Sequence, residues 1–346
     1  MPYVSNAWYV VGWEEDLAPA TPLAITVLQQ PLVLYRAASG RLVALEDRCV
    51  HRLAPLSLGR CEGDRLRCMY HGLLFGPDGK VVEIPGQELV PSHARVRSYP
   101  VRDEAPFVWV WLGAPARAAQ VSPPALPWLT DDSWTALGGA RSTAANYMLL
   151  HDNALDRTHF PYVHPERIHR GYVESPPPLQ IEVTETTVSY RRQFPPAPLT
   201  DWQQAATGLA GDADYTQRES GVFVSPALHV DKMDVLDGAG ATFSSVFVRA
   251  FTPVDPATTL VFWRAARNYA LDDLAVSEAL REVHEGTMTE DEPLLEAIQG
   301  RSDGRPGYGV SAAADAAAIK AYQIVDAMLD EERGRLGRVS GVRRRG

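Results

Sequence analysis

Short apolar runs separated by turn-forming residues fill the first third of the chain. The runs "LAITVL", "PLVLYR" and "LVALE" have the length of single strands, and "AASGR" between the last two has the composition of a hairpin turn. Pro77-Asp78-Gly79 in "LLFGPDGKVVEI" is a second turn signal, because proline presets φ and glycine tolerates positive φ. The run "ARVRSYPVRDEAPFVWVWLG" predicts two further strands. The pattern predicts an all-β domain over residues 1–115.

Prolines interrupt this pattern in "APARAAQVSPPALPW", where Pro115, Pro123, Pro124 and Pro127 lie close together. Proline-rich, irregular segments are typical of domain boundaries. We therefore expect a linker over residues 116–128 and a second domain over residues 129–346.

The second domain alternates between helical and strand patterns. "NYMLLHDNALDRTHF" has a helical pattern that Pro161 is expected to end. Strand-like runs follow in "QIEVTETTVSYRRQF", "GVFVSPALHVDKMDVL", "TFSSVFVRAFTPV" and "TTLVFWRAARNYA", and two helical stretches cover about residues 272–299 and 312–336. Strands followed by helices favour an α+β domain of helix-grip type, in which a long helix lies across an antiparallel sheet.

Composition narrows the class of protein. The 346 residues are 45% apolar and 22% charged, as in ordinary globular proteins, and the net charge of −10 argues against nucleic acid as a partner. Glu14, Glu15 and Asp16 interrupt the N-terminus before any apolar run reaches signal-peptide length. No run approaches the roughly 18 apolar residues that span a bilayer, so we expect a cytoplasmic protein without a membrane partner.

All three cysteines lie in "CVHRLAPLSLGRCEGDRLRCMYHG", an arrangement that favours metal or redox chemistry over a secreted disulfide framework. Cys49-x-His51 and Cys68-x2-His71 offer one thiolate and one imidazole each. A Rieske [2Fe–2S] centre needs two cysteines on one iron and two histidines on the other. A structural Cys2His2 zinc site has the same ligand set, but zinc fingers group the cysteines apart from the histidines. Cys61 is left over, and we expect it to be a partly buried free thiol.

Four histidines gather in "HDNALDRTHFPYVHPERIH": His151, His159, His164 and His169. A non-heme Fe(II) oxygenase site needs two histidines and one carboxylate, with open positions for O2 and substrate. The pairs His159/His164 and His164/His169 have the same spacing, so spacing leaves the choice between them open.

Acidic and amide residues near these histidines add to the prediction. On a helix, Asp156 and Asn153 lie on the same face as His159, and Asp156 is placed to accept the second N–H of its imidazole. The third ligand must be an acidic residue that folding brings in, and spacing does not rank the C-terminal candidates Asp272, Asp273, Asp291 and Asp303.

Together these motifs resemble the Rieske non-heme iron oxygenases, in the branch that includes vanillate O-demethylase and dicamba monooxygenase. "NAWYVVGW" resembles the family's opening, the cysteine-rich stretch its Rieske loops, and "DNALDRTHFPYVH" its iron-binding helix. "TEDEPLLEAIQ" is similar to the acidic segment of the closing helix, although Met288 stands where an aromatic residue is common and Ile298 replaces a frequent glutamine. The resemblance covers nearly the whole chain.

The resemblance implies a role for each matching residue. Asp156 matches an aspartate that links the metal-bound His159 to a cluster histidine, His71, of a neighbouring subunit, which implies a homotrimer. Asn153 matches a frequent asparagine near the iron. The implied ligands are Cys49, His51, Cys68 and His71 for the [2Fe–2S] cluster, and His159, His164 and Asp291 for a mononuclear Fe(II).

The implied function is that of a terminal monooxygenase that takes electrons from NAD(P)H through a separate ferredoxin-type reductase. No nucleotide-binding glycine motif follows a strand here, which fits a separate reductase. The expected reaction is O-demethylation of a small methoxylated aromatic acid, in which a hydroxylated methyl group leaves as formaldehyde. Hydroxylation of an aromatic ring or methyl group is the alternative. A Rieske electron carrier is a further class, which the long C-terminal part and the Asp156, His159 and His164 set disfavour. A helix-grip module that binds an apolar ligand without consuming O2 is another.

Overall fold

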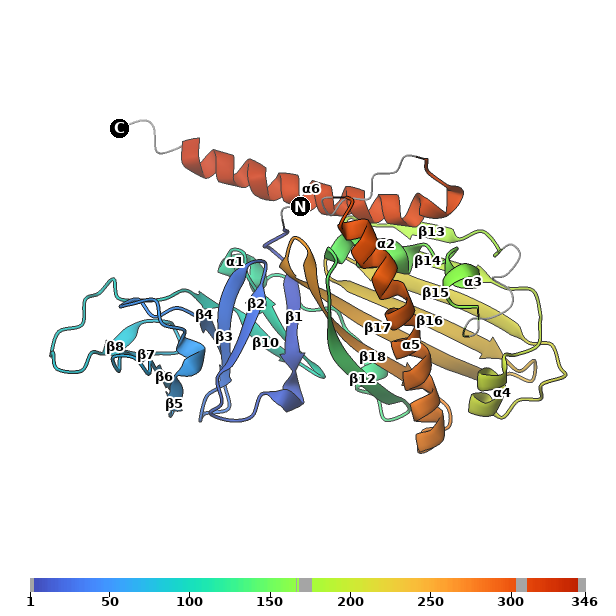
Figure 1. Ribbon diagram of the computed structural model, residues 1–346, viewed down its shortest axis with the longest axis horizontal. Coiled ribbons are helices and arrows are strands. Elements are labelled where there is room, and N and C mark those ends of the chain that lie inside the picture. Colours follow the sequence, from blue (N-terminus) through green and yellow to red (C-terminus); the bar gives the residue numbers. More distant parts are fainter. Residues whose placement is uncertain (1–2, 166, 168–175, 303–309, 342–346) are drawn as a thin grey trace. The chain divides into compact units, whose positions relative to one another are not determined.

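A computed structural model describes residues 3–165, 167, 176–302 and 310–341. These residues form two compact units (Figure 1). The N-terminal unit comprises Ser5–Pro123 together with Thr252–Asp255, and the C-terminal unit consists mainly of residues 124–251 and 256–346. Within the described parts of the chain, no helix is both long and apolar enough to cross a membrane.

The N-terminal unit is built from small antiparallel sheets, in the orders β1-β11-β10, β2-β3-β4-β9 and β5-β6-β7-β8. Tyr35, Leu45, Leu66 and Phe75 are fully buried in a core shared by the second and third sheets. Its strands are β1 (Trp8–Trp13), β2 (Leu23–Val27), β3 (Gln30–Arg36), β4 (Leu42–Glu46), β5 (Arg60–Glu62), β6 (Arg65–Arg67), β7 (Leu74–Phe75), β8 (Val81–Glu83), β9 (Ser98–Tyr99), β10 (Val101–Glu104) and β11 (Phe107–Trp111). The predicted all-β N-terminal region is thus confirmed, with short helical turns only at Glu14–Asp16, Leu56–Leu58 and Pro115–Ala118 (α1) among the described residues.

One sheet of seven strands dominates the C-terminal unit, in the order β12-β18-β17-β16-β15-β14-β13. The sequence pattern did not predict β12, because Gly138 and Gly139 interrupt its alternation of apolar and polar residues. It nevertheless pairs with β18 along its whole length, and a Cβ at Gly138 would lie 2.2 Å from the Trp263 carbonyl oxygen. The strands are β12 (Thr135–Thr143), β13 (Gln180–Val183), β14 (Thr187–Gln193), β15 (Thr216–Val224), β16 (Leu228–Leu236), β17 (Thr242–Asp255) and β18 (Thr258–Arg267).

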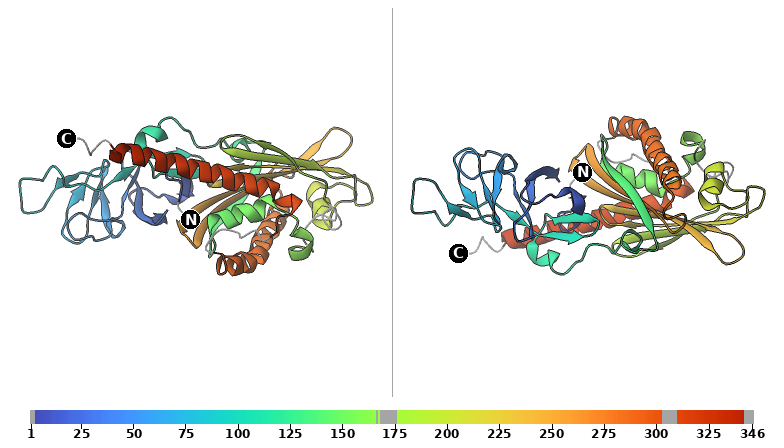
Figure 2. Two further views of the ribbon diagram at one scale, coloured as in Figure 1. Left: turned by 90° about the horizontal axis from the view of Figure 1, so that it is seen from above. Right: turned by 90° about the horizontal axis from the view of Figure 1, so that it is seen from below.

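Helices cover one face of this sheet. The long helix α5 crosses the face, and Leu280 on it packs against Leu137, Phe247 and Trp263 of the sheet (Figure 1). Figure 2 views the unit from two further directions, with α2 and α5 lying together on one side of the strands. The predicted α+β class, with a long helix across an antiparallel sheet, is confirmed. The helices are α2 (Tyr147–Leu155), α3 (Phe160–Val163), α4 (Asp201–Thr207), α5 (Leu274–Gln299) and α6 (Ala316–Gly341), with 3-10 turns at Pro127–Leu129 and Ala313–Asp315.

The helix expected to run up to Pro161 is shorter and divided. α2 begins where the Asn146 side chain accepts a hydrogen bond from the Met148 amide, and it ends at Leu155. Asp156 follows with extended backbone angles, and Pro161 lies in the first turn of α3, where proline is well tolerated. His159 and His164 therefore flank a separate short helix, and the chain turns between Asp156 and His159.

Candidate active site

Two loops of the N-terminal unit present the predicted cluster ligands. Cys49 lies on the loop after β4 and Cys68 on the loop between β6 and β7, and each side chain is only 2% exposed. His51 and His71 are exposed on the same two loops, with their ring centroids 4.5 Å apart. The structure therefore sorts the four side chains into a buried thiol pair and an exposed imidazole pair.

This sorting bears on the choice between one metal ion and two. The ligands of a single tetrahedral zinc ion lie within about 4 Å of one another, given Zn–S near 2.3 Å and Zn–N near 2.0 Å. Among the residues described, the four loop side chains do not form a group whose donor atoms all lie within 4.8 Å of one another. A cysteine pair and a histidine pair on separate irons match the arrangement better. Burial raises the pKa of Cys49, so a thiolate there needs a nearby cation.

Cys61, the remaining cysteine, lies on β5 and is half-buried against the core of the N-terminal unit. It forms no disulfide, and burial raises its thiol pKa. The side chain therefore behaves as a packing residue.

In the C-terminal unit, folding brings His159, His164 and Asp291 together. Their donor atoms lie within 4.8 Å of one another, and this is the one group of three or more such donors in the described parts of the chain. The Asp291 Oδ1 atom lies 3.1 Å from His164 Nε2 and 3.4 Å from His159 Nε2.

Both imidazoles are oriented by acceptors on their other nitrogen. His159 Nδ1 lies 2.8 Å from the Asp156 carbonyl oxygen, and His164 Nδ1 lies 2.7 Å from Glu290 Oε2. These acceptors place the proton on Nδ1, so both Nε2 lone pairs face Asp291. His164 Nε2 and Asp291 Oδ1 are buried without a hydrogen-bond partner in the described structure. A cation between them would satisfy both atoms, so this donor set fits a divalent metal ion.

Asp156 contacts His159 through its backbone. Its carboxylate Oδ1 instead accepts from the Thr158 amide, at 2.9 Å, and from the Thr158 hydroxyl, at 2.7 Å. The expected carboxylate contact to His159 is therefore replaced by a carbonyl contact, because the chain leaves the helix at Asp156. Asn153 remains on α2, and its amide nitrogen lies 3.3 Å from His159 Nε2.

The other sequence candidates lie elsewhere. His151 is fully buried, with Nε2 3.0 Å from the Pro226 carbonyl oxygen and its ring between Phe223 and Phe251. Asp273 caps the start of α5 by accepting from two amides there, and Asp272 precedes it. His169 and Asp303 lie outside the described residues.

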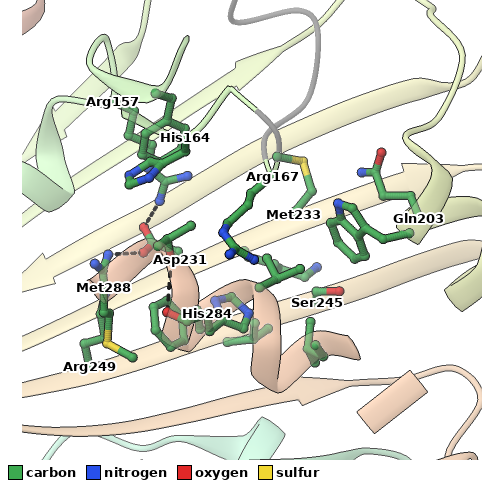
Figure 3. A pocket seen from close by; sticks show the side chains of 18 of the residues that line it. Arg157, His164, Arg167, Gln203, Asp231, Met233, Ser245, Arg249, His284 and Met288 are labelled. Carbon is green, nitrogen blue, oxygen red and sulfur yellow. Dashed lines mark hydrogen bonds and ion pairs between the residues drawn. The ribbon is translucent and has the colours of Figure 1, made fainter. Parts of the chain in front are cut away.

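A pocket opens beside the His159–His164–Asp291 group, between α5 and strands β16 and β17 (Figure 3). It encloses about 170 Å³. A cavity of roughly 150 Å³ is enough to hold benzene, so the pocket has room for a single aromatic ring. Met288, the departure from the aromatic residue common in the resembling family, is part of this lining. Other lining residues include Asn153, Phe247, Leu280 and His284.

Buried charges form one wall of the pocket. Asp231 on β16 pairs with Arg157 and with Arg249 on β17, as the dashed lines in Figure 3 mark. Burial alone would raise the pKa of Asp231, but these guanidinium groups and His229 hold it well below its usual range. Glu219 pairs with Arg157 and with Arg192. Arg192 and Glu219 lie behind the lining, and in the wall itself the two guanidinium groups of Arg157 and Arg249 face the single carboxylate of Asp231.

Arg249 is the arginine of this wall with a free donor beside the cavity that Asp291 lines. Its Nε is buried without a hydrogen-bond partner in the described structure. It lines both the main pocket and a smaller adjoining cavity that includes Asn153, Met288 and Asp291. Arg267 is not part of the lining of either cavity, and it donates to the Tyr269, Ala270 and Asp273 carbonyls at the start of α5.

His284 gives the pocket a neutral imidazole. Its ring stacks on Phe247 at 3.9 Å, and burial, with a smaller effect of Arg249, lowers its pKa to about 3. An unfolded histidine has a pKa near 6.5, so between about pH 3 and 6.5 the unfolded chain binds a proton that the folded chain does not. Acidification through this window should therefore lower the free energy of unfolding.

We expect His284→Gln to reduce that pH dependence. Because glutamine does not titrate, the variant should lose a slope of up to about 1.4 kcal/mol per pH unit in this window. Urea unfolding of both proteins at several values between pH 7 and pH 4 measures the difference. If the free energy of unfolding has the same pH dependence in both proteins, His284 binds its proton equally well in the folded and the unfolded chain.

Sequence reasoning missed Glu290, Asp231 and His284, and it named Arg249 only as one of several arginines able to bind a substrate carboxylate. A signal existed only for Glu290, which directly precedes Asp291 in "TEDEP". The others lie on strands and a helix whose inward faces show only after folding.

Comparisons with known proteins agree with this architecture. The family model described as "Vanillate O-demethylase oxygenase C-terminal domain" matches residues 143–331, and the "Rieske [2Fe-2S] domain" model matches residues 7–100. The solved structure of dicamba monooxygenase bound to 3,6-dichlorosalicylic acid is similar, with a TM-score of 0.88 and 27% identity over 96% of this chain and 99% of that one.

Two curated relatives match along nearly their whole length. The iron–sulfur subunit of the toluene-4-sulfonate monooxygenase system of Comamonas testosteroni is 34% identical, over 96% of this chain and 99% of the relative. The vanillate O-demethylase oxygenase subunit of a Pseudomonas species is 29% identical, over 95% of this chain and 96% of the relative.

Proposed function

The chain belongs to the family of vanillate O-demethylase oxygenases, with a Rieske [2Fe–2S] domain ahead of the catalytic domain, and from that membership we propose that it demethylates a small methoxylated aromatic acid. As a Rieske non-heme iron monooxygenase, it is the oxygenase component of an oxidoreductase system. When bound, the cluster supplies electrons and the mononuclear iron activates O2.

We assign the cluster to Cys49 and Cys68 on one iron and to His51 and His71 on the other. His159, His164 and Asp291 would hold the mononuclear iron. The buried, unpartnered His164 Nε2 and Asp291 Oδ1 atoms support the second assignment. Asn153, which contacts His159 and lines the pocket, would position substrate beside the metal.

The excess positive charge of the pocket wall is the observation that most directly supports an acidic substrate. Arg249 offers an unpaired, buried Nε–H beside a cavity sized for one ring. Burying such a donor is unfavourable unless a ligand satisfies it, and an arginine binds a carboxylate or sulfonate through charge-assisted hydrogen bonds. Asp231 holds the guanidinium in place without neutralising the wall. A ring with one acidic group would fill the site and complete its hydrogen bonding.

Arg249→Gln should therefore weaken binding of acidic substrates while sparing their neutral analogues. Hydrogen bonds to charged groups contribute about 1.5–3 kcal/mol, which corresponds to roughly a 10- to 100-fold rise in KM for the acid. Arg249→Lys keeps the charge and loses the Nε–H, so its KM for the acid should lie between that of the unaltered protein and that of Arg249→Gln. Arg218→Gln, at an exposed position of β15, serves as the control. An equal loss for the acid and for its methyl ester would argue against Arg249 as the acid-binding group.

We further propose that the protein works with a ferredoxin-type reductase that uses NAD(P)H, and that it assembles as a homotrimer. The exposed His51 and His71 rings support electron exchange at the surface of the N-terminal unit. Size-exclusion chromatography with light scattering tests the trimer, and a monomeric mass would contradict it.

A single-turnover experiment tests the reaction itself. Protein with both iron sites filled is reduced without O2 and then exposed to O2 with methoxylated, methylated and unsubstituted aromatic acids. Formaldehyde with the matching phenol supports O-demethylation. A hydroxymethyl product without formaldehyde would favour methyl hydroxylation, the second candidate, which the similarity to a toluene-4-sulfonate monooxygenase subunit supports. Cluster oxidation without any product would exclude both substrate classes.

A further inference from the structure

The two candidate iron-binding histidines are held by acceptors of different charge. His159 Nδ1 faces the neutral Asp156 carbonyl, whereas His164 Nδ1 faces the Glu290 carboxylate at 2.7 Å. The His164 side chain is fully buried, and Glu290 is 35% exposed. A carboxylate partner makes an imidazole a more basic ligand than a carbonyl partner does. The two histidines are therefore not equivalent donors.

Arg167 completes this arrangement from the other side. Its Nε donates to Glu290 Oε1 at 2.9 Å, so the two carboxylate oxygens serve different partners. One of its terminal nitrogens also lies 3.4 Å from the Glu282 carbonyl oxygen. Both contacts are on α5, eight residues apart, so the guanidinium lies along two turns of that helix.

Gly286 provides the space for this side chain. It lies midway between Glu282 and Glu290 on the same face of α5, and a Cβ built there would lie 2.5 Å from Arg167 Cζ. No real Cβ contact is that short, so any larger residue at position 286 would displace the arginine. The local sequence of α5 thus accommodates Arg167, and Arg167 orients Glu290 toward His164.

We propose that Glu290 is a positioning residue for the mononuclear metal and that Arg167, accommodated by Gly286, holds it in place. Glu290 keeps the His164 proton on Nδ1, fixes the ring so that Nε2 faces Asp291, and strengthens the imidazole as a donor. Arg167 holds the Glu290 carboxylate in place and partly neutralises its negative charge beside Asp291. The inference rests on the proposed metal site but adds two residues that do not bind the metal themselves.

Metal affinity is the readout that tests this role. The mononuclear site is emptied with a chelator while the Rieske cluster is retained, as its visible spectrum shows, and Co²⁺ is titrated against a competing chelator. Loss of a partner that orients a metal-bound histidine typically costs 10- to 100-fold in affinity. We expect that loss for Glu290→Leu, a smaller one for Glu290→Gln, which keeps an acceptor, and an intermediate one for Gly286→Val.

Glu282→Gln is the matched control, because it is on the same face of α5 and contacts Arg167 only through its backbone. It should bind Co²⁺ as the unaltered protein does and give the same Co²⁺ absorption spectrum. If Glu290→Leu keeps its affinity within about threefold while His159→Ala loses it, the positioning role is wrong and the metal site stands. If His159→Ala also keeps its affinity, the metal site, and with it the proposed function, is wrong. If Glu290→Leu does not fold, Glu290→Gln decides, and an unchanged affinity and spectrum there overturn the proposal.

Discussion

Replacing His159 with alanine is expected to remove the mononuclear iron and abolish product formation while leaving the Rieske cluster intact. His159 contributes one of three donors, and its Nε2 lies 3.4 Å from Asp291 Oδ1. Two protein ligands cannot hold Fe(II) tightly with so many open positions. Because the metal contributes several kcal/mol to catalysis, turnover should fall by on the order of 10³-fold or more.

Iron analysis and the visible spectrum together check this expectation. Total iron should fall from about three per chain to about two, with the cluster absorption unchanged. Asp291→Ala should behave alike, and His93→Ala, at an exposed position of the N-terminal unit, should change neither quantity. Simultaneous loss of the cluster and the mononuclear iron would show that His159 supports the fold as a whole, and that the metal assignment is wrong.

Asp156→Asn is expected to keep both metals bound and yet slow product formation by roughly 100-fold, the upper end of the range for groups that support a metal-bound histidine. The contact that orients His159 comes from the Asp156 carbonyl, which asparagine retains. The carboxylate Oδ1 serves Thr158, and Oδ2 has no partner among the described residues. In the proposed trimer, Oδ2 would accept the N–H of His71 from a neighbouring subunit, and the charge lost in asparagine would weaken that link.

Rapid mixing of reduced protein with O2 and substrate separates the possible causes. The cluster should reoxidise slowly in Asp156→Asn, while the iron content and the mass of the assembly stay unchanged. Thr158→Ala, which removes only one of the hydrogen bonds to the carboxylate, should reoxidise nearly as fast as the unaltered protein. Normal cluster reoxidation in Asp156→Asn would contradict a bridging role and leave Asp156 as a purely local turn residue.

Regular periodicity was sufficient to predict the fold class. Strand hairpins such as β15–β16 and the two long helices show their patterns within windows of ten to thirty residues, so both the all-β N-terminal region and the α+β class follow from local sequence. The helix before Pro161 was predicted wrongly because Asp156, Arg157 and Thr158 fit a helix as well as a turn. Their side chains decide the turn through contacts such as Arg157 with Asp231, which is 74 residues away.

Candidate ligands were predictable in the same way wherever they lie on one short segment. Each cysteine–histidine pair occupies a single loop, and His159 and His164 are five residues apart, so local spacing was enough to identify them as candidate metal ligands. Spacing left His169 open as a partner, and the family resemblance made the choice between the pairs.

The sequence by itself thus determined the fold class, the family and the two local sets of candidate metal donors, because each depends on residues that are neighbours along the chain. The family resemblance had already pointed to Asp291 among four acidic candidates, but only the tertiary structure showed it beside His159 and His164, showed Glu290 and Arg167 behind His164, and placed Arg249 in the pocket lining. Those residues reach the site from α5, from β17 and from the chain after α3. The physical reason is that the position of a donor relative to a metal or a substrate depends on how α5 crosses the sheet, and packing between distant elements leaves no periodic signal in the sequence.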